Sequence, residues 1–267
     1  MLLAEGAVLN YEAGNPTFET NPNAPNRFRR VRVGRMRIGG LQKNSFIDYP
    51  GKISCVLFLA GCNFSCPYCH NPQLVGSPGV AEEPLTIEDF LAFLAERRGL
   101  LEGVVISGGE PTLHSDLPDL CRRIKHMGYA VKMDTNGSRP QMLRRLITEN
   151  LVDYLAMDIK MEPDRYVGGV TCQCDTGAIL DSLELLMASG IDHEFRTTCV
   201  KPLVTSETIE CIARLIQGGR LYVLQPFKAS RLLRPDYFNG ADPSCSEAEM
   251  DGFQRIAAAW VETCTRR

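Results

Sequence analysis

Short apolar runs alternate with amphipathic stretches along most of the chain. Runs rich in Val, Ile, Leu and aromatic residues, bounded by Gly, Pro, Asn or Asp, predict β-strands. We predict six such strands: 53–60, 104–107, 130–133, 154–159, 194–199 and 221–224. Between them apolar residues recur at helical spacing, as in 87–94, where Thr86 and Asp89 form a capping pattern, and in 209–216. This alternation is typical of parallel βα units. Six units are too few to close an eight-stranded barrel, so the pattern predicts an α/β fold, a partial (βα)6 barrel open on one side.

The first 35 residues differ from the rest in composition. They are rich in Asn, Pro and Gly, and the stretch 21–26 cannot propagate a helix or a central strand. We therefore expect an irregular, flexible N-terminal arm over 1–35 and one folded domain over 36–267. The arginine-rich stretch 27–37 fits either a solvated tail or a segment that docks onto an acidic partner.

Composition narrows the function classes. With 267 residues, 44% of them hydrophobic, the chain can bury one large core. Its net charge of −3 gives no electrostatic footprint for nucleic acid. No apolar run reaches the ~20 residues that cross a bilayer, and the N-terminus lacks the basic and apolar regions of a signal peptide. Eleven cysteines in such a chain indicate reduced thiols, and hence the cytoplasm.

Three cysteines lie in one short run directly after the first predicted strand. Cys62, Cys66 and Cys69 have the spacing C-x3-C-x2-C, and no fourth cysteine lies nearby. Three thiolates on one loop suit a cubane iron–sulfur cluster in which one iron has no protein ligand. Such an open iron can bind and reduce a molecule, whereas a fully ligated cluster only passes electrons.

Three other interpretations of these cysteines remain. Residues 66–70 also match the C-x-x-C-H pattern of covalent haem, which normally requires export and leaves Cys62 unexplained. Structural zinc with His70 as fourth ligand would need the adjacent side chains of Cys69 and His70 to converge on one ion. The third is that they are simply buried thiols, as we expect for Cys55, Cys121, Cys199 and Cys211 in apolar patterns. The pair Cys172 and Cys174 is too sparse for a second cluster.

Polar motifs follow the remaining predicted strands or, in the fifth, lie within it. They are 107–111, 134–137, 158–160, 196–198 and 225–228. Because active sites of β/α barrels form where the carboxyl ends of the strands converge, we expect these motifs to surround the cysteine loop. A glycine pair lets a ligand approach the backbone closely, Glu110 can accept from an ammonium, and Arg196 and Lys160 can hold a carboxylate. These strand-end motifs suit a ligand with an amino group, a carboxylate and an apolar or sugar portion. If the amino and carboxylate groups chelate the open iron, such a ligand has the chemistry of S-adenosylmethionine.

Together these residues resemble the radical S-adenosylmethionine superfamily. The cysteine motif with an aromatic residue before Cys69, followed by Gly-Gly-Glu-Pro at 108–111, carries the resemblance. The strings at 46–52, 61–63 and 66–72 are more specifically similar to the glycyl-radical-enzyme activases. Within these the chain is most similar to the activating protein of anaerobic ribonucleoside-triphosphate reductase. The resemblance implies a partial barrel of the radical S-adenosylmethionine type.

The resemblance also implies a mechanism. Cys62, Cys66 and Cys69 would hold a 4Fe–4S cluster as the catalytic centre, with the fourth iron chelating S-adenosylmethionine. An electron from the cluster would break the bond from sulfonium to the 5′ carbon. The resulting 5′-deoxyadenosyl radical would take a hydrogen from one glycine of a partner enzyme. The implied partners are a glycyl-radical enzyme, with anaerobic ribonucleoside-triphosphate reductase expected, and a low-potential electron donor such as flavodoxin or ferredoxin.

By the same likeness, ten residues would bind the cofactor: Tyr68, His70, Gly108, Gly109, Glu110, Asp134, Asn136, Asp158, Lys160 and Arg196. The Gly-Gly-Glu run would hold its amino group, residues 68–70 would line the adenosine, and Lys160 and Arg196 would steady the carboxylate and ribose. Another set, Asp134, Thr135 and Asp158, matches positions that bind a monovalent cation beside the cofactor in pyruvate formate-lyase activases.

The chain departs from the family at two places. Phe227 and Lys228 follow Pro226 where formate-lyase activases have Tyr and His, and the ferredoxin-like insert of larger activases is missing. An alternative function is a radical S-adenosylmethionine enzyme for a small molecule, similar to 7-carboxy-7-deazaguanine synthase. Those enzymes generally follow the last cysteine with Asp-Thr, whereas this chain has His-Asn-Pro at 70–72, which favours the activase. The ring of strand-end motifs argues against a third alternative, a metal-stabilised binding module without catalysis.

Overall fold

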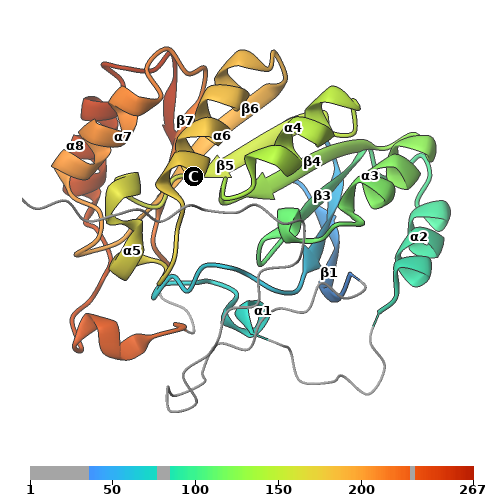
Figure 1. The fold of residues 1–267 in the computed structure, drawn as a ribbon, viewed down its shortest axis with the longest axis horizontal. Coiled ribbons are helices and arrows are strands. Elements are labelled where there is room, and N and C mark those ends of the chain that lie inside the picture. The colour runs from blue at the N-terminus through green and yellow to red at the C-terminus, as the bar shows by residue number, and fades with distance from the viewer. Residues whose placement is uncertain (1–35, 77–84, 229–231) are drawn as a thin grey trace, which may run out of the picture. The chain divides into compact units, whose positions relative to one another are not determined.

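The structure is a computed structural model that describes residues 36–76, 85–228 and 232–267, so the arm expected over 1–35 lies outside the described residues. Within these ranges eight strands form one sheet in chain order, shown in Figure 1: β1 Ile38–Ser45, β2 Ser54–Leu59, β3 Gly103–Gly108, β4 Ala130–Thr135, β5 Tyr154–Asp158, β6 Asp192–Cys199, β7 Tyr222–Pro226 and β8 Cys264–Arg266. Strands β2 to β8 are parallel, and β1 pairs antiparallel with β2. Because β1 and β8 are the two edges, the barrel is open on one side as predicted.

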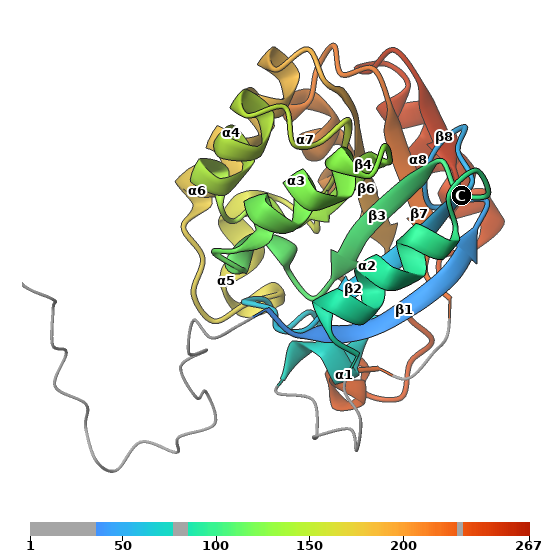
Figure 2. The same ribbon diagram turned by 90° about the vertical axis from the view of Figure 1, so that its right-hand side faces the viewer.

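The six predicted strands are confirmed as β2 to β7, but the sequence pattern missed both edges. Strand β1, with the sequence IGGLQKNS, has only two apolar side chains among its eight residues and is only partly buried, so it has no apolar alternation to detect. Strand β1 is held in the sheet by its antiparallel pairing with β2, in which Ile38 lies opposite Leu59 and Ser45 opposite Ser54. Figure 2 shows the two strands side by side. Strand β8 has three residues and follows β7. The prediction of six βα units is therefore correct for the core of the sheet, but it omitted the two edge strands β1 and β8.

The longer helices cover the outer side of the curved sheet, and the short helices α1 Pro72–Val75 and α5 Tyr166–Gly169 lie at the end where the cysteine loop is (Figures 1 and 2). The longer helices are α2 Ile87–Glu96, α3 Leu117–His126, α4 Pro140–Thr148, α6 Thr176–Ala188, α7 Ser206–Leu215 and α8 Glu247–Ala257, with short 3-10 turns η1 Pro111–Leu113, η2 Pro163–Arg165 and η3 Pro235–Phe238. The predicted cap of α2 is confirmed: Thr86 Oγ1 accepts from the Asp89 backbone at 3.1 Å, and Asp89 Oδ2 accepts from the Thr86 backbone at 3.0 Å. Phe90 and Leu94 of this helix are fully buried against the sheet.

The inner face of the sheet holds a separate apolar cluster at its amino-terminal end. Tyr49, from the turn between β1 and β2, is buried against Val56 and Val105, and its ring lies 6.0 Å from that of Tyr154. A side chain at Gly103 would place its Cβ 2.8 Å from the Tyr49 ring, so the glycine is needed for this close approach. Tyr49 thus fills the floor of the partial barrel and leaves the polar residues above it facing the strand ends.

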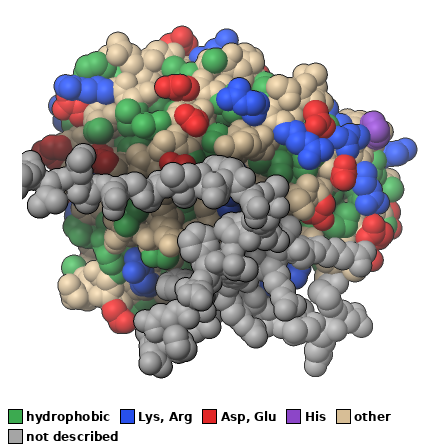
Figure 3. All heavy atoms as spheres, viewed as in Figure 1, with side chains coloured by type: hydrophobic (Ala, Val, Ile, Leu, Met, Phe, Trp, Pro, Cys, Tyr) green, Lys and Arg blue, Asp and Glu red, His purple; other side chains and the backbone are tan. Residues whose placement is uncertain are grey.

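The surface over α3 and α4 carries charges of both signs, as Figure 3 shows. Arg122 pairs with Glu149 at 2.8 Å, and Arg145 reaches the same carboxylate at 2.7 Å. Exposed pairs of this kind contribute only ~0.2–1 kcal/mol each. Among the described residues no helix is both long enough and apolar enough to cross a bilayer.

Candidate active site

The cysteine loop leaves the carboxyl end of β2 and is tied to its surroundings by backbone hydrogen bonds. The Gly61 amide donates to the Leu74 carbonyl at 2.7 Å, and the Ser65 amide donates to the Val170 carbonyl at 2.8 Å. Cys66 is buried, whereas Cys62 and Cys69 are half-buried. The loop therefore presents three thiols from a backbone that is anchored at α1 and α5.

Burial keeps the thiols of the cysteine loop protonated while no metal is bound. Burial raises the pKa of Cys62 to about 12 and that of Cys66 to about 11, so without metal the thiols stay protonated and metal binding must displace protons. Among the described residues no three Cys, His, Asp or Glu side chains are arranged to hold one ion. A cubane binds each thiolate to a different iron and does not need that convergence, so the three cysteines fit a cluster.

The glycines that end β3 lie directly against the cysteine loop. Gly108 has φ of +127°, and a Cβ there would lie 2.2 Å from the Leu59 carbonyl oxygen. At Gly109 a Cβ would lie 2.0 Å from the Gly61 carbonyl oxygen. The sequence led us to expect that a ligand needs this open backbone, but the group that approaches here is the chain's own loop. Contact of the two glycines with the cofactor stays a prediction.

Glu110 follows these glycines and is completely buried. Its Oε1 accepts from the backbone amide of Thr112 at 3.1 Å and from the hydroxyl of Thr135 at 2.9 Å. Oε2 accepts from the Asn136 amide at 2.6 Å. Burial raises the pKa of Glu110, while these donors oppose the rise. The Glu110 carboxylate thus already accepts hydrogen bonds from the ends of β3 and β4, which gives it a positioning role. Its bond from the cofactor's ammonium stays a prediction.

Asn136 joins the end of β4 to the cysteine loop. Its Nδ2 donates to Asn63 Oδ1 at 3.0 Å, and Asn63 Nδ2 donates to the Ser138 hydroxyl at 2.9 Å. The Asn136 side chain, predicted to bind the cofactor, is therefore partly used to hold the residue next to Cys62. Asn63 was missed by the sequence analysis, because a side-chain contact 73 residues away leaves no local pattern.

Three of the predicted cofactor residues meet at the ends of β5 and β6. Arg196 Nε donates to Asp158 Oδ1 at 2.7 Å, and Lys160 Nζ donates to Asp158 Oδ2 at 2.9 Å. Burial alone would raise the pKa of Asp158, but Arg196 and Lys160 outweigh it and hold that pKa well below its ordinary value. The three side chains form one charged group at the mouth of the barrel, with Asp134 within 3.3 Å of the Arg196 guanidinium.

Thr135 points away from this group. Successive side chains of a strand lie on opposite faces, and the Thr135 hydroxyl accordingly bonds Glu110 and accepts from the Gly137 amide at 3.1 Å. Lys132, two residues before Asp134, lies on the Asp134 face instead and contacts that carboxylate at 2.5 Å. The sequence analysis missed Lys132, although the alternation of Lys132 and Asp134 in β4 was a visible signal of a polar inner face.

Tyr68 supplies an unsatisfied polar atom beside the cluster loop. Only 3% of it is exposed, yet its hydroxyl has no hydrogen-bond partner among the described residues. Burial raises the pKa of Tyr68 well above its usual value, the nearby Cys66 adds to this, and the positive charge of Lys160 opposes it. A buried hydroxyl without a partner is costly, so this site is suited to a ligand that supplies the missing bond.

His70 lies against the residue that departs from the family pattern. Its ring stacks on that of Phe227 with centroids 5.8 Å apart and planes 12° apart. Phe227 is buried at the end of β7, so it holds the chain that leaves Cys69.

The cysteines outside the loop vary in burial. Cys55, Cys121 and Cys199 are buried as predicted, whereas Cys211 is half-buried and Cys172 is exposed.

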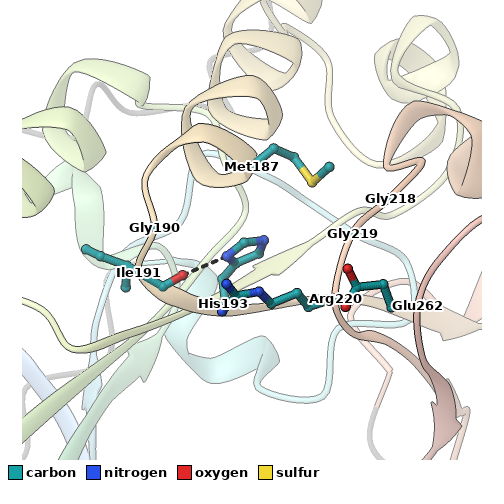
Figure 4. Close-up of a pocket in the computed structure, with 8 residues that line it drawn as sticks. All are labelled: Met187, Gly190, Ile191, His193, Gly218, Gly219, Arg220 and Glu262. Carbon is teal, nitrogen blue, oxygen red and sulfur yellow. Dashed lines mark hydrogen bonds between the residues drawn. The ribbon is translucent and has the colours of Figure 1, made fainter.

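A cavity of about 100 Å³ lies at the opposite, amino-terminal end of strands β6 and β7 and is shown in Figure 4. His193 Nδ1 lies 2.8 Å from the Ile191 carbonyl oxygen, which only accepts, so the proton is on Nδ1. The other ring nitrogen, Nε2, has no partner among the described residues. This cavity is separate from the strand ends where the predicted site residues meet.

The sequence profile of the radical SAM superfamily matches residues 56–217, which spans β2 to α7. The chain belongs to the radical SAM superfamily. Enzymes of this family use a 4Fe–4S cluster and S-adenosylmethionine, and the cysteine loop and strand ends described above are where this chain would hold them.

Three relatives illustrate the range of similarity. The chain is 38% identical over 238 residues to a candidate glycyl-radical enzyme activating enzyme of Methanocaldococcus jannaschii, covering 86% of this chain and 95% of that protein. It is 30% identical over 195 residues to the pyruvate formate-lyase-activating enzyme of Clostridium pasteurianum (69% and 77% covered). It is 26% identical over 201 residues to the 7-carboxy-7-deazaguanine synthase of Thermococcus kodakarensis (66% and 75% covered).

A solved structure supports the fold alone. The crystal structure of Streptococcus suis SuiB bound to the precursor peptide SuiA is similar with a TM-score of 0.57 at 10% identity, covering 77% of this chain and 46% of that one.

Proposed function

We propose that this chain is an activase that generates a glycyl radical on a partner enzyme, and that the partner is anaerobic ribonucleoside-triphosphate reductase. The 38% identity to the Methanocaldococcus jannaschii protein across nearly the whole of both chains carries the first half of the proposal. The second half rests on the motif likeness, above all the His-Asn-Pro that follows Cys69.

Held by Cys62, Cys66 and Cys69, a reduced cluster would supply the one electron needed for reductive cleavage of S-adenosylmethionine, with methionine and 5′-deoxyadenosine as products and the glycine of the partner as the source of the hydrogen atom. This chain's own residues prepare that step. Cys62, Cys66 and Cys69 bind the metals, and the Tyr68 hydroxyl offers the ligand a hydrogen bond. Lys160 and Arg196, both paired with Asp158, present positive charge toward a carboxylate.

The short chain after β7 favours a protein substrate over a small molecule. The Arg234 amide donates to the Pro67 carbonyl at 3.1 Å, and the Lys201 amide donates to the Pro243 carbonyl at 2.8 Å. The segment 234–244 is thus tied down at both ends, beside the cysteine loop and beside the end of β6. Within the part of the chain that the structure describes, this segment is therefore not free to seal a pocket over a small substrate, whereas a large partner can cover the site itself.

The test is an anaerobic mixture of the reconstituted enzyme, S-adenosylmethionine, a flavodoxin or ferredoxin reducing system and the reductase from the same cell. We expect an electron-spin-resonance doublet from a glycyl radical on the reductase. The matched control replaces the radical-bearing glycine of the reductase with alanine, which should abolish the doublet while cofactor cleavage continues.

Two results would count against the proposal. A doublet that survives the glycine replacement would show that the radical is elsewhere. Absence of a doublet with every glycyl-radical enzyme of the same cell would favour the small-molecule alternative, to which the deazaguanine synthase likeness belongs.

A further inference from the structure

The family likeness implied a monovalent cation held by Asp134, Thr135 and Asp158, and the structure does not fit that group. The Thr135 hydroxyl lies on the opposite face of β4 and is bonded to Glu110. Both oxygens of Asp158 are occupied, Oδ1 by Arg196 and Oδ2 by Lys160. Of the three expected ligands, Thr135 has its hydroxyl turned away and Asp158 has both carboxylate oxygens in hydrogen bonds.

The third expected ligand already has a cation of the chain's own. Lys132 Nζ lies 2.5 Å from Asp134 Oδ1, and the Arg196 guanidinium lies 3.3 Å from the same oxygen. Lys132 is 1% exposed, and its ammonium lies 5.9 Å from the centre of the Tyr154 ring, which favours a cation at its face. The ammonium is therefore fixed inside the barrel, directly below the mouth.

The charged side chains around Asp134 and Asp158 have no excess of negative charge that would attract a further cation. Two carboxylates, Asp134 and Asp158, face three cationic side chains, Lys132, Lys160 and Arg196. The next carboxylate, Glu194, is paired with Arg267 through both oxygens, at 2.8 and 3.3 Å, and so does not reverse the balance. The group carries one net positive charge, which favours an anionic part of a ligand over another cation.

We propose that the ammonium of Lys132 takes the place of the monovalent cation, so that this enzyme binds S-adenosylmethionine without Na⁺ or K⁺. Lys132 acts as a positioning residue: it holds Asp134, which in turn contacts Arg196. A metal ion at Asp134 would have to displace Lys132 from the carboxylate that it contacts at 2.5 Å, and a buried ammonium that loses its partner is unfavourable. The inference rests on the cofactor site proposed above and not on the choice of partner enzyme.

The experiment compares the reconstituted holoenzyme in KCl, NaCl and choline chloride at one ionic strength, without any partner enzyme. S-adenosylmethionine affinity is measured by calorimetry and by the change in the spin-resonance spectrum of the reduced cluster. For the parent we expect affinities in the three salts that agree within about twofold. In Lys132→Met, affinity in choline should fall about tenfold, the loss of one charge-assisted contact, and K⁺ or Na⁺ should restore most of it.

A direct readout is the relaxation of ²³Na, which broadens when the ion binds a protein. The parent with S-adenosylmethionine should show no saturable broadening, and Lys132→Met should show it. Lys125→Met is the matched control, because Lys125 makes a comparable contact with Asp153 on the surface, and it should behave as the parent.

Several results would overturn the proposal. One is a parent enzyme that needs K⁺ or Na⁺, or that binds ²³Na saturably. Another is a Lys132→Met holoenzyme whose lost affinity no salt restores. If Lys132→Met fails to hold its cluster, the test uses Lys132→Arg and the parent instead. Cofactor binding that is independent of K⁺ and Na⁺ in both proteins supports the proposal, and a requirement for either cation in one of them contradicts it. None of these readouts uses a glycyl radical, so a wrong partner assignment leaves them unaffected.

Discussion

The Glu110 carboxylate accepts a hydrogen bond from the Asn136 backbone amide at 2.6 Å and, with the bond from the Thr135 hydroxyl, ties the end of β3 to the end of β4. Asn136 in turn bonds Asn63 beside the first cluster cysteine. The strand-end motifs are thus linked to the cysteine loop through the chain itself before any cofactor is bound.

Replacing Glu110 should first affect stability. In Glu110→Ala the buried donors of Thr112, Thr135 and Asn136 lose their acceptor, and hydrogen bonds to a charged group are worth ~1.5–3 kcal/mol each. We expect the free energy of unfolding to fall by about 3 kcal/mol or more, measured by urea denaturation. Glu110→Gln keeps one carbonyl acceptor and should lose less. Equal denaturation midpoints for parent and Glu110→Ala would contradict the positioning role.

The cluster assignment is tested by iron content. Cys66→Ala removes one of three thiolates and should abolish the roughly four irons per chain expected after anaerobic reconstitution. The exposed Cys172 lies outside the motif, so Cys172→Ala should retain full iron and an unchanged cubane spectrum. Stoichiometric zinc or covalent haem in the parent, with no iron, would refute the assignment.

Tyr68→Phe separates a ligand contact from a structural one. Because the hydroxyl has no partner among the described residues, its removal should leave the stability of the ligand-free chain unchanged or raise it by about 1 kcal/mol. Affinity for S-adenosylmethionine should fall about three- to tenfold, the worth of one neutral hydrogen bond. Calorimetric binding and thermal melting give the two readouts. A variant that melts earlier but binds the cofactor normally would show that the hydroxyl is structural.

The lowered pKa values of Asp134 and Asp158 predict how stability depends on pH. Burial opposes ionisation, but Arg196 is the largest favourable influence on both carboxylates. Since the folded pKa lies below the unfolded value of about 3.9, the stabilisation is complete above about pH 5 and is lost as the pH falls through 4 and lower. Urea denaturation of the cluster-free chain should show this loss. Arg196→Met should be less stable at pH 7 and show a smaller decline in acid, and an equally steep decline would contradict the assignment.

The sequence predicted what depends on local pattern and missed what depends on distant contacts. Strands β2 to β7 and the cap of α2 could be predicted because apolar runs and the Thr86–Asp89 spacing are local. The edge strand β1 could not, since its order comes from pairing with β2.

The same division applies to the site. The three cysteines and the strand-end motifs were evident as residue types at fixed spacing, but their partners were not. From the sequence, Glu110 is expected to accept a hydrogen bond from a ligand. Only the fold shows that Thr112, Thr135 and Asn136 already donate to its carboxylate. Lys132 was within reach of sequence reasoning, because a lysine two residues before an aspartate in a strand must share its face.

Tyr49, which fills the floor of the barrel, has a consequence for how a ligand reaches the site. Among the described residues Tyr49 occupies the amino-terminal end of the inner face, packed against Val56 and Val105. A ligand therefore reaches the strand-end motifs from the mouth or from the open side of the sheet, between the edge strands β1 and β8. A partner that docks on this side would cover a bound cofactor and shield it from solvent.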